Sequence, residues 1–156
     1  MRRKSTSGSR PTRPDLAALV APLGRTLMAA ELPVLRAHDL SMWGYTVLVR
    51  LEDEPVRTQA ALAQAIGADK TRIIPILDDL QDRGLIRREP DPDDRRVRLV
   101  SVTAKGRRVR TSAQDAIQRQ EERLLARVPA ADRRAFLRVL QELSRVSADE
   151  FIDPSA

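Results

Sequence analysis

Three consecutive residues near the middle of the chain, Lys70, Thr71 and Arg72, carry side chains that suit the edges of DNA base pairs. An arginine can hold guanine through two hydrogen bonds, a threonine can bond a base or contact the thymine methyl group, and a lysine can take guanine or phosphate. Asp69, directly before them, can accept hydrogen bonds from the free N–H groups that begin a helix. We therefore expect the three side chains on the first turn of a helix.

A shorter helix is predicted immediately before this one. Thr58 can cap its start, and Gly67 suits the left-handed residue that ends a helix. Thr58 and Gln59 are then placed for phosphate contacts through hydroxyl, amide and backbone N–H groups. Two helices joined by so tight a turn predict a helix-turn-helix, whose second helix enters the major groove. The predicted buried face of the first helix comprises Ala61, Leu62, Ala65 and Ile66.

The second helix should extend to Gly84, which again suits a helix stop. Pro75 falls in its second turn and removes one backbone donor, at roughly 3 kcal/mol in an ordinary helix interior. A tolerated kink is the favoured account, and a bend that re-aims the first turn into the groove is the alternative. The predicted inner face comprises Ile73, Ile76, Leu77 and Leu80.

A β-hairpin with a basic tip is predicted next. Leu85 to Glu89 and Arg96 to Val102 are compatible with strands, and the residues between them are rich in proline and aspartate. The alternation of apolar residues slips within the second strand, which leaves its buried face open. Arginine at such a tip suits a narrow minor groove, and Asp94 is close enough to orient one. The alternative is a solvated turn with an Asp–Arg pair worth well under about 1 kcal/mol. The basic residues concerned are Arg95, Arg96 and Arg98.

Apolar stripes at helical spacing flank this unit on both sides. The first begins after Asp15, a candidate cap, and contains Pro22 and Pro33, near which we expect kinks or a break. A further helix should follow the candidate caps Asp39 and Ser41, and Thr103 should cap a long helix. EDEPVR, before Thr58, is predicted to be a loop. A last amphipathic helix is predicted after Pro129, with an inward face comprising Phe136, Val139, Leu140 and Leu143.

Composition narrows the classes of protein. Apolar residues make up 42% of the chain and aromatic residues only 3%, which suits packed helices. The formal net charge of +6 is uneven: residues 1–14 carry five basic and no acidic side chains, and residues 85–110 carry nine basic and four acidic ones. Residues 1–14 are predicted to be a disordered basic tail, with phosphate contact left open. No apolar run approaches the length of a membrane span, so we predict a cytoplasmic protein without a membrane partner.

The stretch DDLQDRGLIRREPDPDDRRVRLVSVTAKG resembles the recognition-helix end, wing and next helix of MarR family winged-helix transcription regulators. The resemblance implies a mainly α (α+β) winged helix-turn-helix with N- and C-terminal dimerisation helices. It places a winged lobe at about 41–103, dimerisation helices at about 15–38 and 104–147 (within a domain 15–147), and a tail at 148–156. It also implies that Arg96 inserts into the minor groove, held by Asp94. The expected protein is a homodimer on a pseudo-palindromic operator, as a repressor released by a small molecule. The uncovered apolar stripes independently favour a two-fold dimer.

The resemblance further implies an effector pocket near the start of the second helix. His38, Met42, Trp43 and Tyr45 fall there, and they would suit a small aromatic or anionic effector. Core packing is the more common role for a single Trp and Tyr at helical spacing. The absence of cysteine excludes the family's peroxide-sensing mechanism.

Enzyme classes are poorly supported. The chain has no nucleophile turn, no phosphate-cradling glycine loop and only one histidine for a metal site. We predict no catalytic residues, no metal and no cofactor. The competing hypothesis is a winged-helix module that binds another protein and has no sequence-specific DNA binding.

Overall fold

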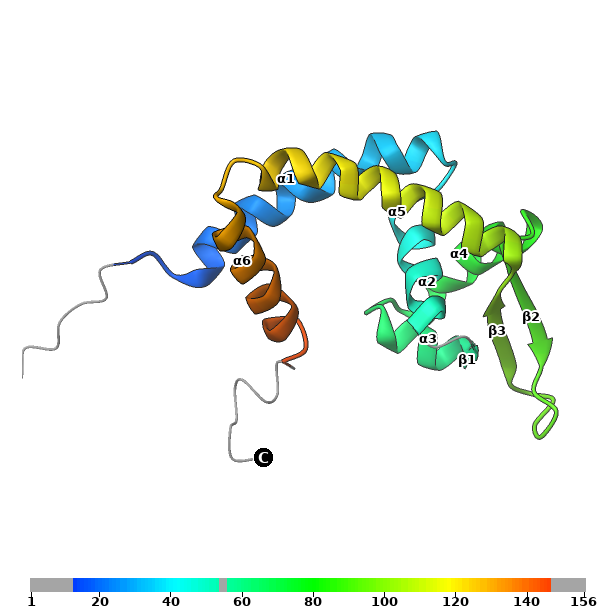
Figure 1. Ribbon diagram of the computed structural model, residues 1–156. Coiled ribbons are helices and arrows are strands. Elements are labelled where there is room, and N and C mark those ends of the chain that lie inside the picture. The colour runs from blue at the N-terminus through cyan, green and yellow to red at the C-terminus, as the bar shows by residue number, and fades with distance from the viewer. Residues whose placement is uncertain (1–12, 54–55, 147–156) are drawn as a thin grey trace, which may run out of the picture. The chain divides into compact units, whose positions relative to one another are not determined.

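The fold is mainly helical with one small antiparallel sheet, as predicted. The computed structural model describes residues 13–53 and 56–146, so nearly all of the predicted N-terminal tail and the whole of residues 148–156 lie outside the described residues. The chain divides into two compact units, Met1–Arg110 and Thr111–Ala156. The elements labelled in Figure 1 are α1(Leu16–Ala37), α2(Met42–Asp53), β1(Val56–Thr58), α3(Gln59–Ala65), α4(Lys70–Asp82), β2(Ile86–Pro90), β3(Arg98–Val102), α5(Ala104–Leu125) and α6(Ala130–Leu143).

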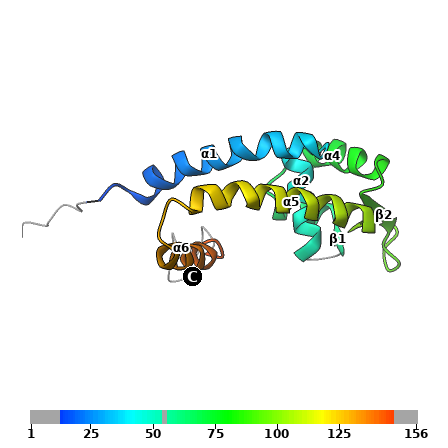
Figure 2. The ribbon, with the colours of Figure 1, turned by 45° about the horizontal axis from the view of Figure 1, so that its top comes forward.

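Helix α1 continues through both of its prolines, so of the expected kinks or break the break is wrong (Figure 2). Each proline removes only one backbone donor, and the Thr26 hydroxyl donates to the Pro22 carbonyl at 3.0 Å. Asp15 occupies the N-cap position, but its side chain makes no capping hydrogen bond. The C-terminal end of α1 is anchored by Val34 and Leu35, both of which are buried. The local free-energy cost of Pro22 and Pro33 is therefore tolerated within one continuous helix.

The same helix corrects a second expectation, that no apolar run approaches the length of a membrane span. Over its 22 residues α1 is long and apolar enough to cross a membrane, by length and composition alone. Core helices of soluble proteins pass the same test, and this one carries Arg25 and Glu31 along its length. The finding is weak evidence for a membrane location.

Helix α2 provides the centre of the core in the first unit. Ser41 caps it, as predicted, because its hydroxyl accepts a hydrogen bond from the Gly44 N–H at 2.9 Å. Val47, Leu48 and Leu51 lie on its inner face and have no solvent exposure. These residues give the following helix pair a rigid surface to pack on.

Helices α3 and α4 form the predicted helix-turn-helix. Gly67 has a φ of 66°, and the N–H groups of Gly67 and Ala68 bond back to Gln64 and Ala63, closing α3 with a Schellman motif. Gly84, with a φ of 67°, ends α4 in the same way. The buried face of α3 is partly wrong, because Leu62 and Ala63 are buried while Ala61 is exposed. In α4 the face is confirmed at Ile73, Leu77 and Leu80, and Ile76 is half-buried.

The hairpin of β2 and β3 is confirmed, and it belongs to a three-stranded sheet in the order β1-β3-β2. The first two residues of β1, Val56 and Arg57, lie in the segment expected to be a loop, and its last residue, Thr58, pairs with Leu99. The expectation was wrong because three residues carry too little alternation to signal a strand, and β3 supplies the hydrogen bonds. Val100 and Val102 form the buried face of β3.

The start of α5 is fastened to the end of the helix-turn-helix. The Thr103 hydroxyl donates to the Gly84 carbonyl at 2.7 Å and accepts from the Gly106 N–H at 3.0 Å, which confirms Thr103 as a helix cap. The Lys105 ammonium donates to the Arg83 carbonyl at 2.7 Å. Gly106 is itself buried against the Leu85 carbonyl. The turn after the recognition helix is thus held by several bonds from the next helix.

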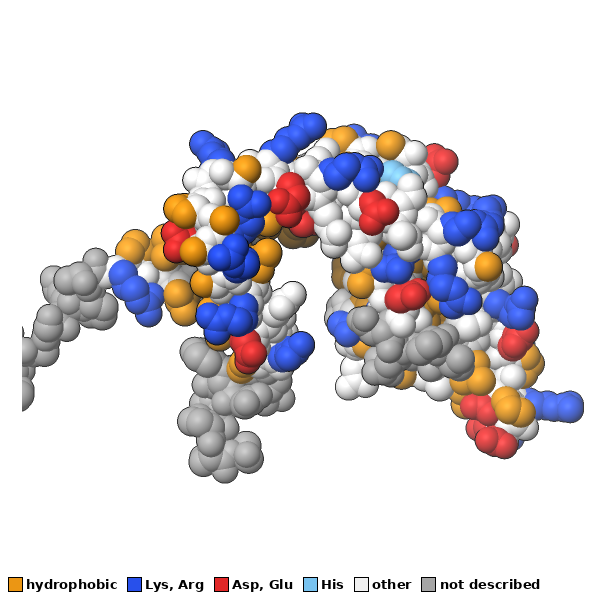
Figure 3. Space-filling model, viewed as in Figure 1, with side chains coloured by type: hydrophobic (Ala, Val, Ile, Leu, Met, Phe, Trp, Pro, Cys, Tyr) orange, Lys and Arg blue, Asp and Glu red, His pale blue; other side chains and the backbone are white. Residues whose placement is uncertain are grey.

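In the second unit, helix α6 exposes the side chains that were expected to face inward. Figure 3 shows hydrophobic side chains on the surface of this helix. The expectation is wrong for the single chain, because its described residues leave the apolar stripe uncovered. The exposed fractions are 44% for Phe136, 46% for Val139, 46% for Leu140 and 58% for Leu143.

Candidate nucleic-acid interface

The first turn of α4 is organised by the carboxylate of Asp69. Its Oδ1 accepts a hydrogen bond from the Arg72 backbone N–H at 2.8 Å and another from the Thr71 hydroxyl at 2.5 Å. The Thr71 hydroxyl, and after it the Arg72 N–H, lower the pKa of Asp69 below its ordinary value. The cap is confirmed, and it fixes the backbone from which Thr71 and Arg72 project. The side chain of Lys70 lies outside the described residues.

This cap makes a pH prediction for the Asp69→Asn variant, which keeps a capping oxygen and removes the charge. A carboxylate whose folded pKa is depressed stabilises the fold above its ordinary pKa, and this contribution is lost as the pH falls through the folded value. The difference in unfolding free energy between wild type and Asp69→Asn should therefore shrink once the pH drops below 3.8. Urea titrations across this range measure it. A difference that does not change with pH would contradict the role given to Asp69.

Arg72, which was predicted to bind DNA, contacts a residue of the predicted effector pocket. Its guanidinium carbon lies 5.8 Å from the centre of the Trp43 ring, within the range of a cation–π contact. Arg72 was predicted to read bases, and Trp43 was predicted to line an effector pocket. The guanidinium of Arg72 therefore packs against Trp43, the residue predicted to line the effector pocket.

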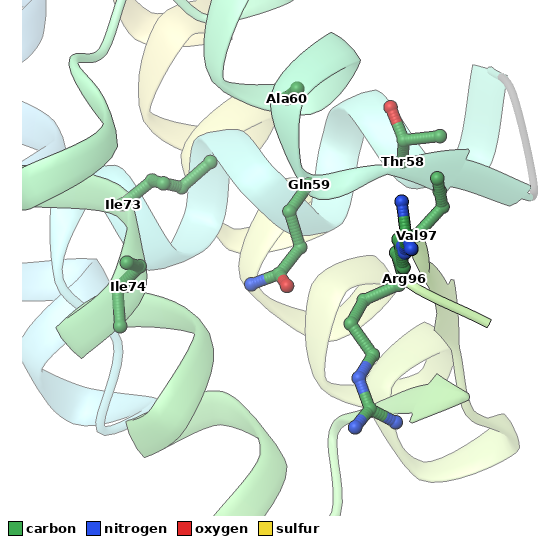
Figure 4. A pocket seen from close by; sticks show the side chains of 8 residues that line it. Thr58, Gln59, Ala60, Ile73, Ile74, Arg96 and Val97 are labelled. Atoms are coloured by element: carbon green, nitrogen blue, oxygen red, sulfur yellow. The ribbon is translucent and has the colours of Figure 1, made fainter. Parts of the chain in front are cut away.

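A groove of about 360 Å³ brings four of the other predicted DNA-binding residues together. It combines the start of α3 with the middle of α4 and the wing. Figure 4 shows Gln59 projecting into it, with Ile73 and Ile74 on one side and Arg96 and Val97 on the other. Its floor is largely aliphatic and its charges are two arginines. The lining residues are Thr58, Gln59, Ala60, Ile73, Ile74, Arg96, Val97 and Arg98.

Asp94 acts on the tip of the wing through the backbone. Its Oδ1 accepts a hydrogen bond from the Arg96 N–H at 3.0 Å, and its carbonyl accepts from the Val97 N–H at 2.9 Å. Within the described part of the chain it forms no ion pair with Arg95 or Arg96. We expected Asp94 to orient an arginine side chain, whereas in the structure it bonds to the Arg96 backbone. It shapes the turn, and the two arginine side chains are exposed to solvent. Figure 3 shows acidic side chains gathered beside a basic one at this tip.

The residues predicted to bind an effector are half-buried. His38 follows α1, where its Nδ1 lies 2.8 Å from the Val34 carbonyl oxygen. Met42, Trp43 and Tyr45 lie on the first turn of α2. Core packing and ligand contact both fit this degree of burial. Within residues 13–53 and 56–146 no cluster of three His, Cys, Asp or Glu side chains is placed to hold a metal ion.

Two residues near the interface were not singled out from the sequence. Arg88 on β2 reaches across to α4, where it bonds to Gln81 and forms an ion pair with Asp78 at 2.5 Å. Ile74 is 48% exposed at the edge of the groove. Neither position carries a local sequence signal, because an arginine on an exposed strand and an isoleucine on a helix flank are both common.

The helix pair, its glycine turn and the hairpin define a winged helix-turn-helix protein, and the comparisons assign its family. The MarR family model matches residues 40–97. Transcriptional regulator HosA of Escherichia coli O111:H- is 30% identical over 105 residues, which cover 67% of this chain and 78% of that protein. The chain belongs to the MarR family of transcription regulators, which are DNA-binding proteins and not enzymes.

Solved structures of at least 25% identity include one with bound DNA and one with a bound ligand. The transcriptional repressor CouR bound to a 23-mer DNA duplex is 27% identical with a TM-score of 0.72, covering 84% of this chain and 93% of that one. The PcaV regulator of Streptomyces coelicolor, in complex with its natural ligand, is 26% identical with a TM-score of 0.62, covering 86% and 97%.

Proposed function

We propose that this protein is a homodimeric repressor, which binds a pseudo-palindromic operator and is released by a small aromatic or anionic effector in the cytoplasm. The observation that carries the proposal is the groove in which the start of α3, the helix α4 and the wing arginines meet. A repressor of this fold bound to a DNA duplex, and a regulator of this fold bound to its ligand, support it by similarity.

Each element has a separate role in the proposed complex. Thr58 and Gln59 contact phosphates at the start of α3, where free N–H groups attract anions. Lys70, Thr71 and Arg72 read base edges in the major groove. The wing enters the minor groove with its arginines, and Asp94 holds the backbone of Arg96 in place. The arginines concerned are Arg95, Arg96 and Arg98.

The proposed dimer rests on two exposed apolar faces. Helices α1 and α6 expose large apolar side chains to solvent. Exposed apolar patches of this kind mark interaction sites. We therefore assign residues 15–38 and 104–147 to dimerisation and residues 41–103 to the winged lobe. The exposed large apolar side chains of α1 are Leu16, Leu19, Val20, Met28 and Leu32.

Light scattering at micromolar concentration tests this assignment. It should return a particle of about 35 kDa, twice the chain mass of 17.5 kDa. Val139→Glu in α6, where the wild-type side chain is 46% exposed, should shift the protein toward the monomer, because it buries an unpaired charge in the interface. Gln64→Glu, which adds the same charge at an exposed site of α3 in the winged lobe, is the control. A 17.5 kDa particle from the wild-type chain would rule out the dimer.

The salt dependence of binding separates DNA recognition from the alternative, a winged helix that binds only another protein. Each phosphate contact releases counterions, and about six contacts give a slope near −5 in a plot of log affinity against log salt. Titration of a labelled duplex against rising sodium chloride gives this slope. A protein that retains a partner but shows no salt-dependent affinity for any duplex would favour the alternative.

The effector part of the proposal is tested through the chain's only tryptophan. Salicylate-like acids that enter beside His38 and Trp43 should displace the Arg72 guanidinium from the indole ring and change the fluorescence. Arg72→Met, which removes the cation, should abolish that part of the change while leaving Trp43 in place. A flat response to such acids in both proteins would leave core packing as the role of Trp43.

A further inference from the structure

We propose that Arg88 is a positioning residue, which fixes the direction of the wing relative to the recognition helix so that both reach DNA at once. This inference rests on the proposed DNA binding and adds a residue that does not itself need to touch DNA. It gives a role to Asp78, an acidic side chain of α4 that the proposed contacts leave unused.

The contacts of Arg88 join β2 to the C-terminal half of α4. Its Nη2 donates to Asp78 Oδ1 at 2.5 Å, and its Nε donates to Gln81 Oε1 at 2.6 Å. Asp78 and Gln81 are three residues apart, so both lie on one face of the helix. A planar guanidinium that bonds two acceptors at once has little freedom to turn. Only 19% of the Arg88 side chain is exposed.

This bridge ties β2 to α4 further along the chain than the bonds that close the end of α4. One of these bonds lies at the start of β2, where the Leu85 N–H donates to the Leu80 carbonyl at 2.8 Å. Three residues further along the strand, about 10 Å away, Arg88 forms the bridge. Bonds from α5 hold the turn at Gly84, and the Arg88 bridge adds a hold further along β2 that fixes the direction of the strand. Because β2 continues into the wing, the bridge sets where Arg96 lies relative to Arg72.

The neighbouring arginine provides an internal contrast. Arg87 is 67% exposed in its side chain and lies 3.6 Å from Glu89 of its own strand. It therefore links no two elements. Asp78 and Asp79 form a second matched pair, since Asp79 bonds to Arg83 at the C-cap of its own helix, at 3.2 Å. In each pair, one residue joins α4 to β2, whereas the neighbour of the same charge pairs close by in the chain.

Direct phosphate contact is the competing role for Arg88. It lines a polar cleft of about 320 Å³ together with Gln59, Gln81 and Arg98, which an anion could occupy. The carboxylate of Asp78 already balances its charge, which weakens that role. The two accounts predict opposite changes in DNA affinity when Asp78 is removed. If Arg88 touches phosphate, removing Asp78 frees it and strengthens binding. If Arg88 positions the wing, removing Asp78 weakens binding.

The test compares Asp78→Ala with Asp79→Ala on a duplex selected from a random pool by the wild-type dimer. Removing an acid from a DNA-binding surface should in general raise affinity. We expect Asp79→Ala to bind equally well or a few-fold more tightly, and Asp78→Ala to bind about tenfold more weakly. Arg88→Met should lose at least as much DNA affinity as Asp78→Ala. Arg87→Met should lose only the few-fold in affinity that removing one positive charge costs. Stronger binding by Asp78→Ala would overturn the proposal.

Two further readouts separate positioning from loss of stability. Combining Asp78→Ala with Arg96→Ala should cost little beyond Arg96→Ala alone, because the wing contact is already lost. Hydroxyl-radical footprinting should show that Asp78→Ala loses protection in the minor groove, and dimethyl sulfate footprinting should show that guanine N7 atoms in the major groove stay protected. Equal loss in both grooves, or full additivity, would overturn the proposal. If the wild-type protein binds no duplex, the proposed function fails; if it binds and the two aspartate variants behave alike, only this inference fails.

Discussion

Replacing Gly106 with alanine should destabilise the protein by about 3 kcal/mol, the upper end of the cost of overpacking. A methyl group built at this position would lie 2.0 Å from the Leu85 carbonyl oxygen and 2.9 Å from the Leu85 carbonyl carbon. These are backbone atoms, so no side chain can turn away to make room. The same carbonyl accepts the Thr103 N–H at 3.0 Å, and displacing it would break the attachment of α5 to the end of the recognition helix.

Urea unfolding at a fixed protein concentration measures this effect, because the stability of a dimer depends on concentration. Gly24→Ala is the control. It lies inside α1 with nothing within 4 Å of the added methyl group, so it should stabilise by about 0.5–1 kcal/mol. Equal unfolding midpoints for wild type and Gly106→Ala would show that the close approach of α5 to Leu85 is not maintained in solution.

Replacing Arg96 with alanine should weaken operator binding by about 1–3 kcal/mol, which is a loss of roughly five- to 150-fold. The Arg96 side chain is exposed at the tip of the wing, its backbone is fixed by Asp94, and it borders the groove that Gln59 enters. Removal should leave the fold unchanged, because the side chain makes no buried contact. The loss should be greatest for operators with A·T-rich flanks, where a narrow minor groove attracts arginine most strongly.

Fluorescence anisotropy with a labelled duplex measures the loss. Arg119→Ala removes the same charge at an exposed site of α5 outside the groove and should change affinity much less. If Arg96→Ala and Arg119→Ala bound the operator equally, the wing tip could not be the minor-groove contact.

Features set by neighbouring residues were predictable from the sequence. Thr58 and Asp69 cap their helices because a side-chain oxygen can reach an N–H only three residues away. Gly67 and Gly84 end helices because the left-handed conformation is strained for other residues. Together these positions defined the helix-turn-helix and the start of the wing, and the charged residues at the candidate site followed from them.

Features set by distant partners were not predictable. Strand β1 exists because β3 completes its hydrogen bonds, and α1 stays continuous although two prolines weaken it locally. The contacts of Arg88 with Asp78 and of Arg72 with Trp43 join separate elements, and no spacing rule foretells them. Asp94 was placed correctly beside Arg96, but only the folded turn distinguishes a bond to the backbone from a bond to the side chain.

Selection of bound duplexes from a random pool tests the central claim most directly, that this chain reads DNA as a two-fold dimer of winged helices. The account predicts strong enrichment of a pseudo-palindrome, whose half-sites have centres about one helical turn apart and carry A·T-rich flanks for the wings. Arg72→Ala should relax the preference within each half-site, and Arg96→Ala should relax it only in the flanks. A pool that shows no enriched sequence after repeated rounds, or a single site without two-fold symmetry, would contradict the account.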